Sequence, residues 1–138
     1  MAGSFDFFVL SLSWSPGFCT FEGGSKAADQ CAPGTGLGFV VHGLWPQNEH
    51  GFPSDCDDAT RNPSRAALAE AEGLYPDLGL ARYEWRKHGT CTGESPADYF
   101  RDVKRARDAI AIPAAFRAPQ SARATSPNAV ARAFFDAN

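Results

Sequence analysis

The first half of the chain contains two stretches whose apolar pattern predicts β-strands. From residue 8 to residue 14 every second side chain is large and apolar, and this period of two marks a strand with one buried face. The sequence Ser15-Pro16-Gly17 ends the strand. After a polar, glycine-rich loop over 22–36, the apolar run 37–41 predicts a second, more deeply buried strand that delivers His42 at its end. Residues 46–58 have the composition of a loop.

The second half of the chain is predicted to be helical. Residues 65–73 favour a short helix, and residues 80–88 contain no breaker, with Gly89 suited to the left-handed position that closes a helix. Ser95 and Ser126 each precede a proline, which predicts capped helices over 96–110 and from 127 onward. The residues expected to face the core on these two helices are Tyr99, Phe100, Val103, Ala106, Ile110, Val130, Phe134 and Phe135. Strands followed by helices indicate an α+β fold.

The composition narrows the class of protein. A chain of 138 residues with 43% hydrophobic and 21% charged residues is too apolar for a disordered protein and fits one domain, which we assign to residues 5–138. No window is apolar enough for a membrane span, so we expect no membrane partner. The net charge of -3 argues against simple coating of nucleic acid. The charge is uneven, however: residues 1–59 hold seven acids and one base, Lys26, whereas residues 60–138 hold twelve bases and nine acids.

The four cysteines predict two disulfides and an oxidising compartment. Their number is even, no CxxC pair is present, and of the three possible pairings sequence proximity favours Cys19–Cys31 and Cys56–Cys91. Loop-closure entropy gives these bridges roughly 3 and 4 kcal/mol respectively. We therefore expect a secreted or periplasmic protein in which residues 1–4 are an expression scar or a start that replaces a signal peptide. A cytosolic protein with four free thiols is the alternative.

Two short segments concentrate residues that suit acid–base chemistry. His42 opens the segment HGLWP at 42–46, and the segment EWRKHGTC occupies 84–91. On a helix, Glu84, Lys87 and His88 share one face, so a carboxylate, an ammonium and an imidazole meet there. With a second histidine, this set suits proton transfer on a phosphate ester.

Two other interpretations of these residues are open. The cluster on the helix can be an ordinary solvated face with weak ion pairs. A zinc site from His42, His50 and His88 can also be imagined, but no ligand spacing supports it, and we expect neither a metal nor another cofactor.

The two segments resemble the active-site signatures of the ribonuclease T2 family of secreted endoribonucleases. The sequence FVLSLSWSP at 8–16, followed by Cys19, is similar to that family's first core strand and cysteine. The resemblance covers residues 5 to about 138, closely at the motifs and loosely after Thr92. It implies a disulfide-bonded α+β fold with a central antiparallel sheet and helices packed on it.

The resemblance also implies a mechanism and a set of site residues. His88 would remove the proton of the ribose 2′-hydroxyl, His42 would protonate the leaving 5′-oxygen, and the product would be a 2′,3′-cyclic phosphate that is later hydrolysed to a 3′-phosphate. Glu84 and Lys87 would stabilise the phosphorane, and no metal is needed. Single-stranded RNA is the expected substrate and DNA should stay uncut, because it lacks the 2′-hydroxyl. We expect a monomer. The residues assigned to substrate binding are Trp45, Gln47, Tyr83 and Arg86, with Phe52 as a further possible base contact.

The chain departs from the family in two respects. Tyr83 stands where the family usually has a histidine, so turnover could be lower unless Arg82 or Arg86 supplies the charge. The family also usually continues for several dozen residues, so this chain could be a compact member, a fragment or a shortened form. A catalytically weak member that binds RNA or a protein, and an unrelated disulfide-bonded secreted interaction domain, are therefore the alternative functions.

Overall fold

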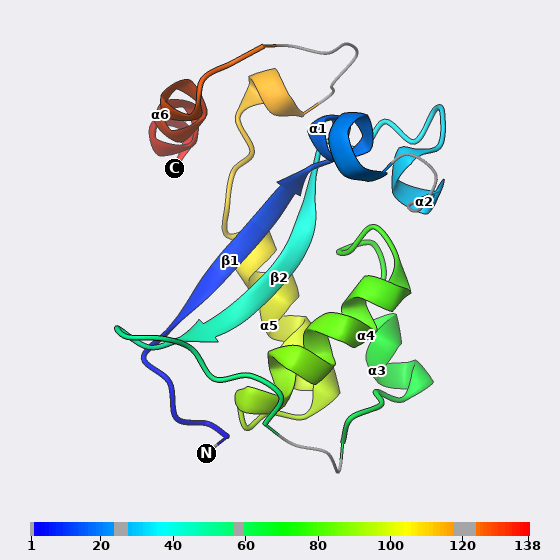
Figure 1. The fold of residues 1–138 in the computed structure, drawn as a ribbon, viewed down its shortest axis with the longest axis vertical. Coiled ribbons are helices and arrows are strands. Elements are labelled where there is room, and N and C mark those ends of the chain that lie inside the picture. The colour runs from blue at the N-terminus through cyan, green and yellow to red at the C-terminus, as the bar shows by residue number, and fades with distance from the viewer. Residues whose placement is uncertain (1, 24–27, 57–59, 118–123) are drawn as a thin grey trace. The chain divides into compact units, whose positions relative to one another are not determined.

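The computed structural model describes residues 2–23, 28–56, 60–117 and 124–138. Met1, which belongs to the expected scar or start, and Lys26, the one base among residues 1–59, lie outside these ranges. Strands β1 (Phe7–Trp14) and β2 (Phe39–Gln47) pair in an antiparallel sheet, two-stranded within these residues (Figure 1). The longer helices are α4 (Leu78–Lys87), α5 (Pro96–Asp108) and α6 (Pro127–Ala137). The shorter ones are α1 (Ser15–Phe18), η1 (Cys19–Gly23), α2 (Ala28–Cys31), α3 (Arg65–Ala69), η2 (Gly89–Cys91) and η3 (Ala114–Phe116). The predicted α+β class is confirmed.

The chain forms two compact units. Unit 1 contains the residues up to Leu12 together with Val41–Arg107, and unit 2 contains Ser13–Val40 and Asp108–Asn138. Both strands therefore contribute residues to both units. No helix in the described part of the chain is long and apolar enough to cross a membrane.

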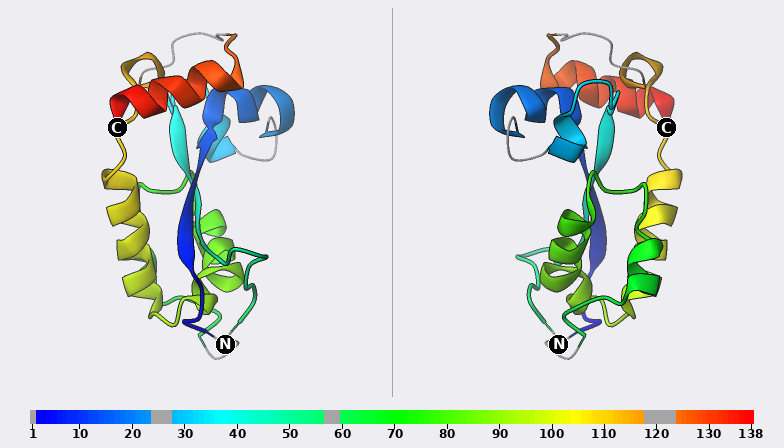
Figure 2. Two further views of the ribbon diagram at one scale, coloured as in Figure 1. Left: turned by 90° about the vertical axis from the view of Figure 1, so that its left-hand side faces the viewer. Right: turned by 90° about the vertical axis from the view of Figure 1, so that its right-hand side faces the viewer.

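The core of unit 1 is built from β2 and helices α3, α4 and α5. Figures 1 and 2 show α5 along one face of the strand residues of this unit. Trp85 of α4 and Tyr99 and Phe100 of α5 are completely buried, as predicted for the last two. Residues of this core are Val41, Leu44, Leu68, Ala71, Tyr75, Ala81, Trp85, Tyr99, Phe100 and Val103. Removing a buried aromatic ring of this kind typically costs about 3–5 kcal/mol, so this core holds α4 firmly against β2.

Side-chain caps begin these helices: the predicted caps Ser95 and Ser126 are present, and Ser64 and Asp77 are two further caps that were not predicted. The Ser64 hydroxyl accepts a hydrogen bond from the Ala67 amide at 3.1 Å, and the Asp77 carboxylate accepts one from the Leu80 amide at 2.8 Å. Ser126 caps α6 in the same way. Each cap satisfies a backbone donor that the first helical turn leaves without a partner.

Unit 2 has a separate aromatic cluster. The rings of Trp14, Phe39, Phe116 and Phe134 contact one another, with Phe39 and Phe134 at 5.2 Å between centroids. The expectation that Phe135 faces the core is wrong, because its side chain is 77% exposed. Successive residues on a helix point about 100° apart, so packing Phe134 inward turns Phe135 to the surface.

Several element boundaries differ from the sequence-based expectation. β2 begins at Phe39 and ends at Gln47, so His42 lies inside the strand and not at its end, and Pro46 is in the strand and not in a loop. A proline is tolerated there because a strand of a two-stranded sheet has a free edge that needs no amide donor. The helix expected over 65–73 ends at Ala69 and continues as turns, and the one expected to reach residue 110 ends at Asp108. The loop expected over 22–36 contains the short helix α2.

Candidate active site

A hollow of unit 1 brings the two signature segments together. It has a volume of about 440 Å³ and receives side chains from β1, β2, α4 and the segment that follows β2. The residues that line it are Val9, His42, Trp45, Gln47, Phe52, Tyr83, Glu84, Lys87 and His88. Seven of these nine are residues that the sequence assigned to catalysis or substrate binding.

Glu84 is the buried centre of this hollow. Its side chain is 1% exposed, and its Oε2 accepts a hydrogen bond from the indole Nε1 of Trp45 at 2.8 Å. Burial raises the pKa of the Glu84 carboxyl to about 7, while the Trp45 hydrogen bond and the Lys87 charge act in the opposite direction. At acidic pH the carboxyl is therefore protonated and can donate a hydrogen bond.

Gly43 makes the contact between Trp45 and Glu84 possible. A Cβ atom at this position would collide with the Trp45 indole and with the Glu84 carboxylate. The glycine of the HGLWP segment is thus required by close packing of the indole on the carboxyl, since any side chain would separate them.

His88 lies at the carboxyl end of α4 and is buried. Its Nε2 lies 4.0 Å from Glu84 Oε2, and its Nδ1 has no hydrogen-bond partner in the described structure. Burial, assisted by the Lys87 charge, lowers the pKa of His88 to about 4. The imidazole is therefore neutral over most of the acidic range, with a free nitrogen lone pair available to accept a proton.

His42 has a different environment. Its side chain is exposed on β2, and its ring meets the Trp45 ring edge to face at 5.7 Å between centroids. Trp45 also contacts the His88 ring at 5.5 Å, so the indole contacts both imidazoles. One histidine is thus open to solvent and the other is enclosed, and both contact the same aromatic ring.

Lys87 and Tyr83 form the outer edge of the hollow. The Lys87 ammonium donates a hydrogen bond to the Tyr83 hydroxyl at 3.1 Å, and this bond is the main cause that raises the pKa of Lys87. Tyr83 is 45% exposed. Tyr83 therefore positions the lysine beside the site.

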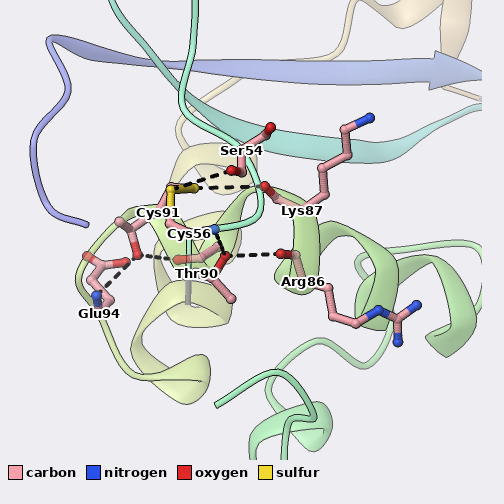
Figure 3. The surroundings of a disulfide bond; sticks show 9 residues. Ser54, Cys56, Arg86, Lys87, Thr90, Cys91 and Glu94 are labelled. Atoms are coloured by element: carbon pink, nitrogen blue, oxygen red, sulfur yellow. Dashed lines mark hydrogen bonds between the residues drawn. A yellow bond between two sulfur atoms is a disulfide. The ribbon is translucent and has the colours of Figure 1, made fainter. Parts of the chain in front are cut away.

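A disulfide fixes the end of α4 beneath this site. The predicted bridge Cys56–Cys91 is present, and so is Cys19–Cys31 in unit 2. Around Cys56–Cys91, the Asp55 amide donates to the Lys87 carbonyl at 2.8 Å. The Cys56 amide donates to the Thr90 hydroxyl at 3.1 Å (Figure 3). These bonds tie the segment after β2 to the turn that carries His88.

Gly89 follows the end of α4, but its role there differs from the one that the sequence indicated. His88 is the C-cap residue, and Gly89 opens η2 without the left-handed conformation that was expected of it. A Cβ atom at Gly89 would collide with the Trp85 ring and crowd Tyr99. This glycine therefore permits close packing in the core and is not needed for a left-handed turn.

Arg86, Arg82 and His50 lie outside the hollow. Arg86 is absent from the lining, and Figure 3 shows its side chain extending from α4 in a different direction from that of Lys87. Arg82 lines another hollow, next to Leu78, and His50 is exposed. Within residues 2–23, 28–56, 60–117 and 124–138, no group of three or more histidine, cysteine or acidic residues could hold a metal ion, so the imagined three-histidine cluster does not form.

Sequence reasoning missed two residues of the site. Val9 lines the hollow from β1, and its position between the alternating large apolar residues of that strand was a usable signal. The charge of Asp55 acts on both Lys87 and His88: it contributes to the raised pKa of Lys87, whose main cause is the Tyr83 hydrogen bond, and it opposes the lowering of the His88 pKa by burial. Asp55 has a positive φ of 51°, which aspartate tolerates better than most residues. Only its position beside Cys56 pointed to it.

The fold matches that of known ribonucleases. The solved structure of ribonuclease MC1 from bitter gourd seeds superposes with a TM-score of 0.69 and 28% identity, covering 96% of this chain and 74% of that one. The structure of RNase NT in complex with 5′-AMP has the same fold, with a TM-score of 0.75 at 23% identity. The protein is therefore similar to these ribonucleases in its fold.

The chain belongs to the ribonuclease T2 family, whose model matches residues 5–125. A ribonuclease of Aeromonas hydrophila is 44% identical over 110 residues, covering 78% of this chain and 48% of its own length. A probable ribonuclease of Haemophilus influenzae is 34% identical over 121 residues, covering 78% and 44% respectively. The chain thus spans about half the length of these curated relatives.

Proposed function

We propose that this chain carries the active site of an endoribonuclease that cleaves single-stranded RNA without a metal ion. The observation that supports the proposal best is the single hollow that holds His42, Glu84, Lys87 and His88 together. RNA brings its own nucleophile, the 2′-hydroxyl, next to the phosphorus, so the protein needs to supply only proton transfers, orientation and charge.

In the proposed reaction, His88 and His42 have opposite tasks. Neutral His88 accepts the proton of the 2′-hydroxyl as its oxygen attacks the phosphorus. The P–O5′ bond breaks, and protonated His42 gives its proton to the departing 5′-oxygen. The product is a 2′,3′-cyclic phosphate, and addition of water with the roles reversed yields the 3′-phosphate. The lowered pKa of His88, about 4, keeps this base neutral in the acidic range.

Glu84 and Lys87 stabilise the phosphorane in this proposal. The Lys87 ammonium supplies positive charge next to the developing dianion. Glu84, with a pKa of about 7, is protonated in acid and donates a hydrogen bond to a phosphoryl oxygen, whereas its ionised form would repel that oxygen. The Trp45 indole holds the carboxyl in place from the other side.

The aromatic and amide groups at the edge of the hollow bind the RNA bases in this proposal. The faces of Trp45 and Phe52 suit stacking, which tolerates different bases, and Gln47 and Tyr83 offer hydrogen bonds. Arg86 does not line the hollow, so it would reach only a phosphate farther along the RNA strand. We also propose that the protein acts as a monomer formed by one domain over residues 5–138, in a secreted or periplasmic setting that the two disulfides suit.

A second function is favoured by one observation. Tyr83 occupies the position of the family's usual histidine and engages Lys87, so the site holds one fewer group that can become cationic. A catalytically weak protein that binds RNA or a protein partner would have this feature. Tight RNA binding without turnover would favour this second function.

The test is cleavage of a set of RNA dinucleotides with a chelator present and with the products identified. We expect a 2′,3′-cyclic phosphate to form first and the 3′-phosphate later, while 2′-deoxy dinucleotides remain uncut. A folded, disulfide-bonded protein that yields no cyclic product, or whose activity depends on an added metal, would contradict the proposal. The set of dinucleotides also reports the base preference.

A further inference from the structure

A second hollow of unit 1 is lined by α3, α4 and Pro63 and lies outside the site described above. Its volume is about 420 Å³, within the range of pockets that bind small molecules. The apolar part of its lining consists of Pro63, Leu68, Ala69 and Leu78, and the charged part consists of Arg65, Glu72 and Arg82. It therefore combines an apolar surface with two guanidinium groups.

The two arginines of this hollow have no partners among the described residues. Within the described part of the chain, neither Arg65 nor Arg82 makes a side-chain hydrogen bond or ion pair, and both are exposed. Arg101 on α5 differs, since it contacts Asp98 at 2.6 Å and Glu70 at 3.3 Å. A guanidinium fork that no carboxylate occupies is a good donor for the two oxygens of a phosphate.

The apolar part of the hollow suits a planar ring. Leu78 is 41% exposed there, so apolar surface is open to a ligand. A nucleobase covers such a surface and also stacks on an arginine plane. Glu72 can accept a hydrogen bond from a base amino group. The lining thus has a place for each part of a nucleotide.

Helix α4 connects this hollow to the active-site hollow. Leu78 and Arg82, four residues apart, form one row on the helix, and Tyr83 and Lys87 form another. An α-helix is about 10–12 Å across with its side chains, so a few nucleotides would span it. Glu84, the one acidic residue of α4, is buried, so RNA crossing the exposed part of this helix meets no carboxylate from it.

We infer that the hollow lined by Arg65 and Arg82 is a remote subsite for one nucleotide of the RNA strand whose cleavage takes place at His42 and His88. The two arginines hold its phosphate, and the surface around Leu78 receives its base. This inference rests on the proposed function. It means that long RNA gains affinity from contacts that a dinucleotide does not reach.

The first experiment compares the double variant Arg65→Ala/Arg82→Ala with a matched control, Arg101→Ala/Arg105→Ala. The control removes the same charge from arginines already paired with Asp98, Glu70 and Asp102. For an oligonucleotide of about 12 nucleotides, kcat/KM should fall about tenfold in the first variant, and the slope of log kcat/KM against log salt should decrease by about 0.7, because the two arginines neutralise one phosphate. The control should change less than about twofold, and dinucleotide cleavage should change in neither.

The second experiment measures binding without cleavage. The dissociation constant of a fluorescent 2′-O-methyl oligonucleotide should rise about tenfold in Arg65→Ala/Arg82→Ala. It should rise severalfold in Leu78→Ser without a change in salt slope, because a base contact is lost and not a phosphate contact. Since this strand lacks the nucleophile, the result does not depend on activity.

The outcomes separate the two proposals. If the protein cleaves no RNA but the arginine variant loses oligonucleotide affinity, the proposed function fails, and only RNA binding at the hollow lined by Arg65 and Arg82 stands. If dinucleotides are cleaved but both double variants retain full affinity for the oligonucleotide, or lose it equally, the subsite is refuted. Oligoglutamate that competes as well as the oligonucleotide would also refute it, since the hollow would then bind any polyanion.

Discussion

The two histidines of the site come from equally clear motifs, yet the structure gives them opposite surroundings. His42 is exposed on β2, whereas His88 is buried at the end of α4 and backed by Glu84 and a disulfide. Burial lowers the pKa of His88 to about 4, so at mildly acidic pH this imidazole is neutral. A motif therefore identifies which residues carry the chemistry, but their environment decides which one accepts a proton.

The largest effect should come from removing either histidine. We expect His42→Ala and His88→Ala each to lower kcat/KM for a dinucleotide by about 10²–10⁴, the usual contribution of a general acid or base. His50→Ala is the matched control, since His50 is exposed and absent from the hollow, and it should retain full activity. Steady-state kinetics on the three variants decides this, and activity that survives His88→Ala would refute the assigned base.

The next prediction concerns the Cys56–Cys91 disulfide and the buried His88 that it supports. Replacing Cys56 and Cys91 by serine should lower the free energy of unfolding by about 4 kcal/mol, against about 3 for Cys19 and Cys31, because the first bridge closes 35 residues and the second 12. Chemical denaturation measures both losses. At temperatures where both variants are folded, only the first should lose activity, because only Cys56–Cys91 holds the turn that carries His88. Equal losses of activity would contradict this difference.

Glu84→Gln tests the protonation state of the buried carboxyl. An amide is neutral at every pH and still donates a hydrogen bond, so we expect this variant to retain activity within about tenfold in acid. The pKa of Glu84, about 7, lies above the ordinary value of 4.5, so ionisation destabilises the fold as pH rises between these values. As the pH rises above about 5, the melting temperature should therefore fall less in Glu84→Gln than in the unmodified protein. A uniform loss beyond 10² in activity would show that the ionised form is needed.

Trp45→Phe separates the hydrogen bond of the indole from its ring. Loss of the Nε1 donor removes an interaction that lowers the Glu84 pKa, so that pKa should rise by about one unit and the alkaline limb of activity should shift with it. Trp85→Phe is the control, because its Nε1 donates to the Thr60 carbonyl at 2.7 Å in the core. It should lower stability and leave the pH profile in place. A shift in both variants, or in neither, would contradict a positioning role for Trp45.

The smallest effect concerns the rim of the hollow. Tyr83→His should free Lys87 from its hydroxyl partner and add a cation in acid, raising turnover a few-fold below about pH 6. Tyr83→Phe is the control, because it also frees Lys87 from the hydroxyl but adds no cation. Turnover that falls in Tyr83→His would show that the tyrosine is the better partner for this site.

The sequence predicted the residues of the site better than it predicted their surroundings. The periods of two and 3.6, the serine caps and cysteine proximity predicted β1, α4, α5, α6 and both disulfides correctly, since these depend on nearby residues. Other features depend on packing between distant segments. These are the need for glycine at positions 43 and 89, the burial of Glu84 and the position of Arg86. Such packing leaves no local pattern, although a helical projection could have separated Arg82 from Lys87.

The most direct test of the central claim is the pH dependence of dinucleotide cleavage, measured from about pH 3 to about pH 9 with a chelator present. We expect a bell-shaped profile of kcat/KM. Its acidic limb should fall below about pH 4, where His88 becomes protonated, and its alkaline limb should include the ionisation of Glu84 near pH 7. A rate that continues to rise through neutrality would show that a different base performs the reaction.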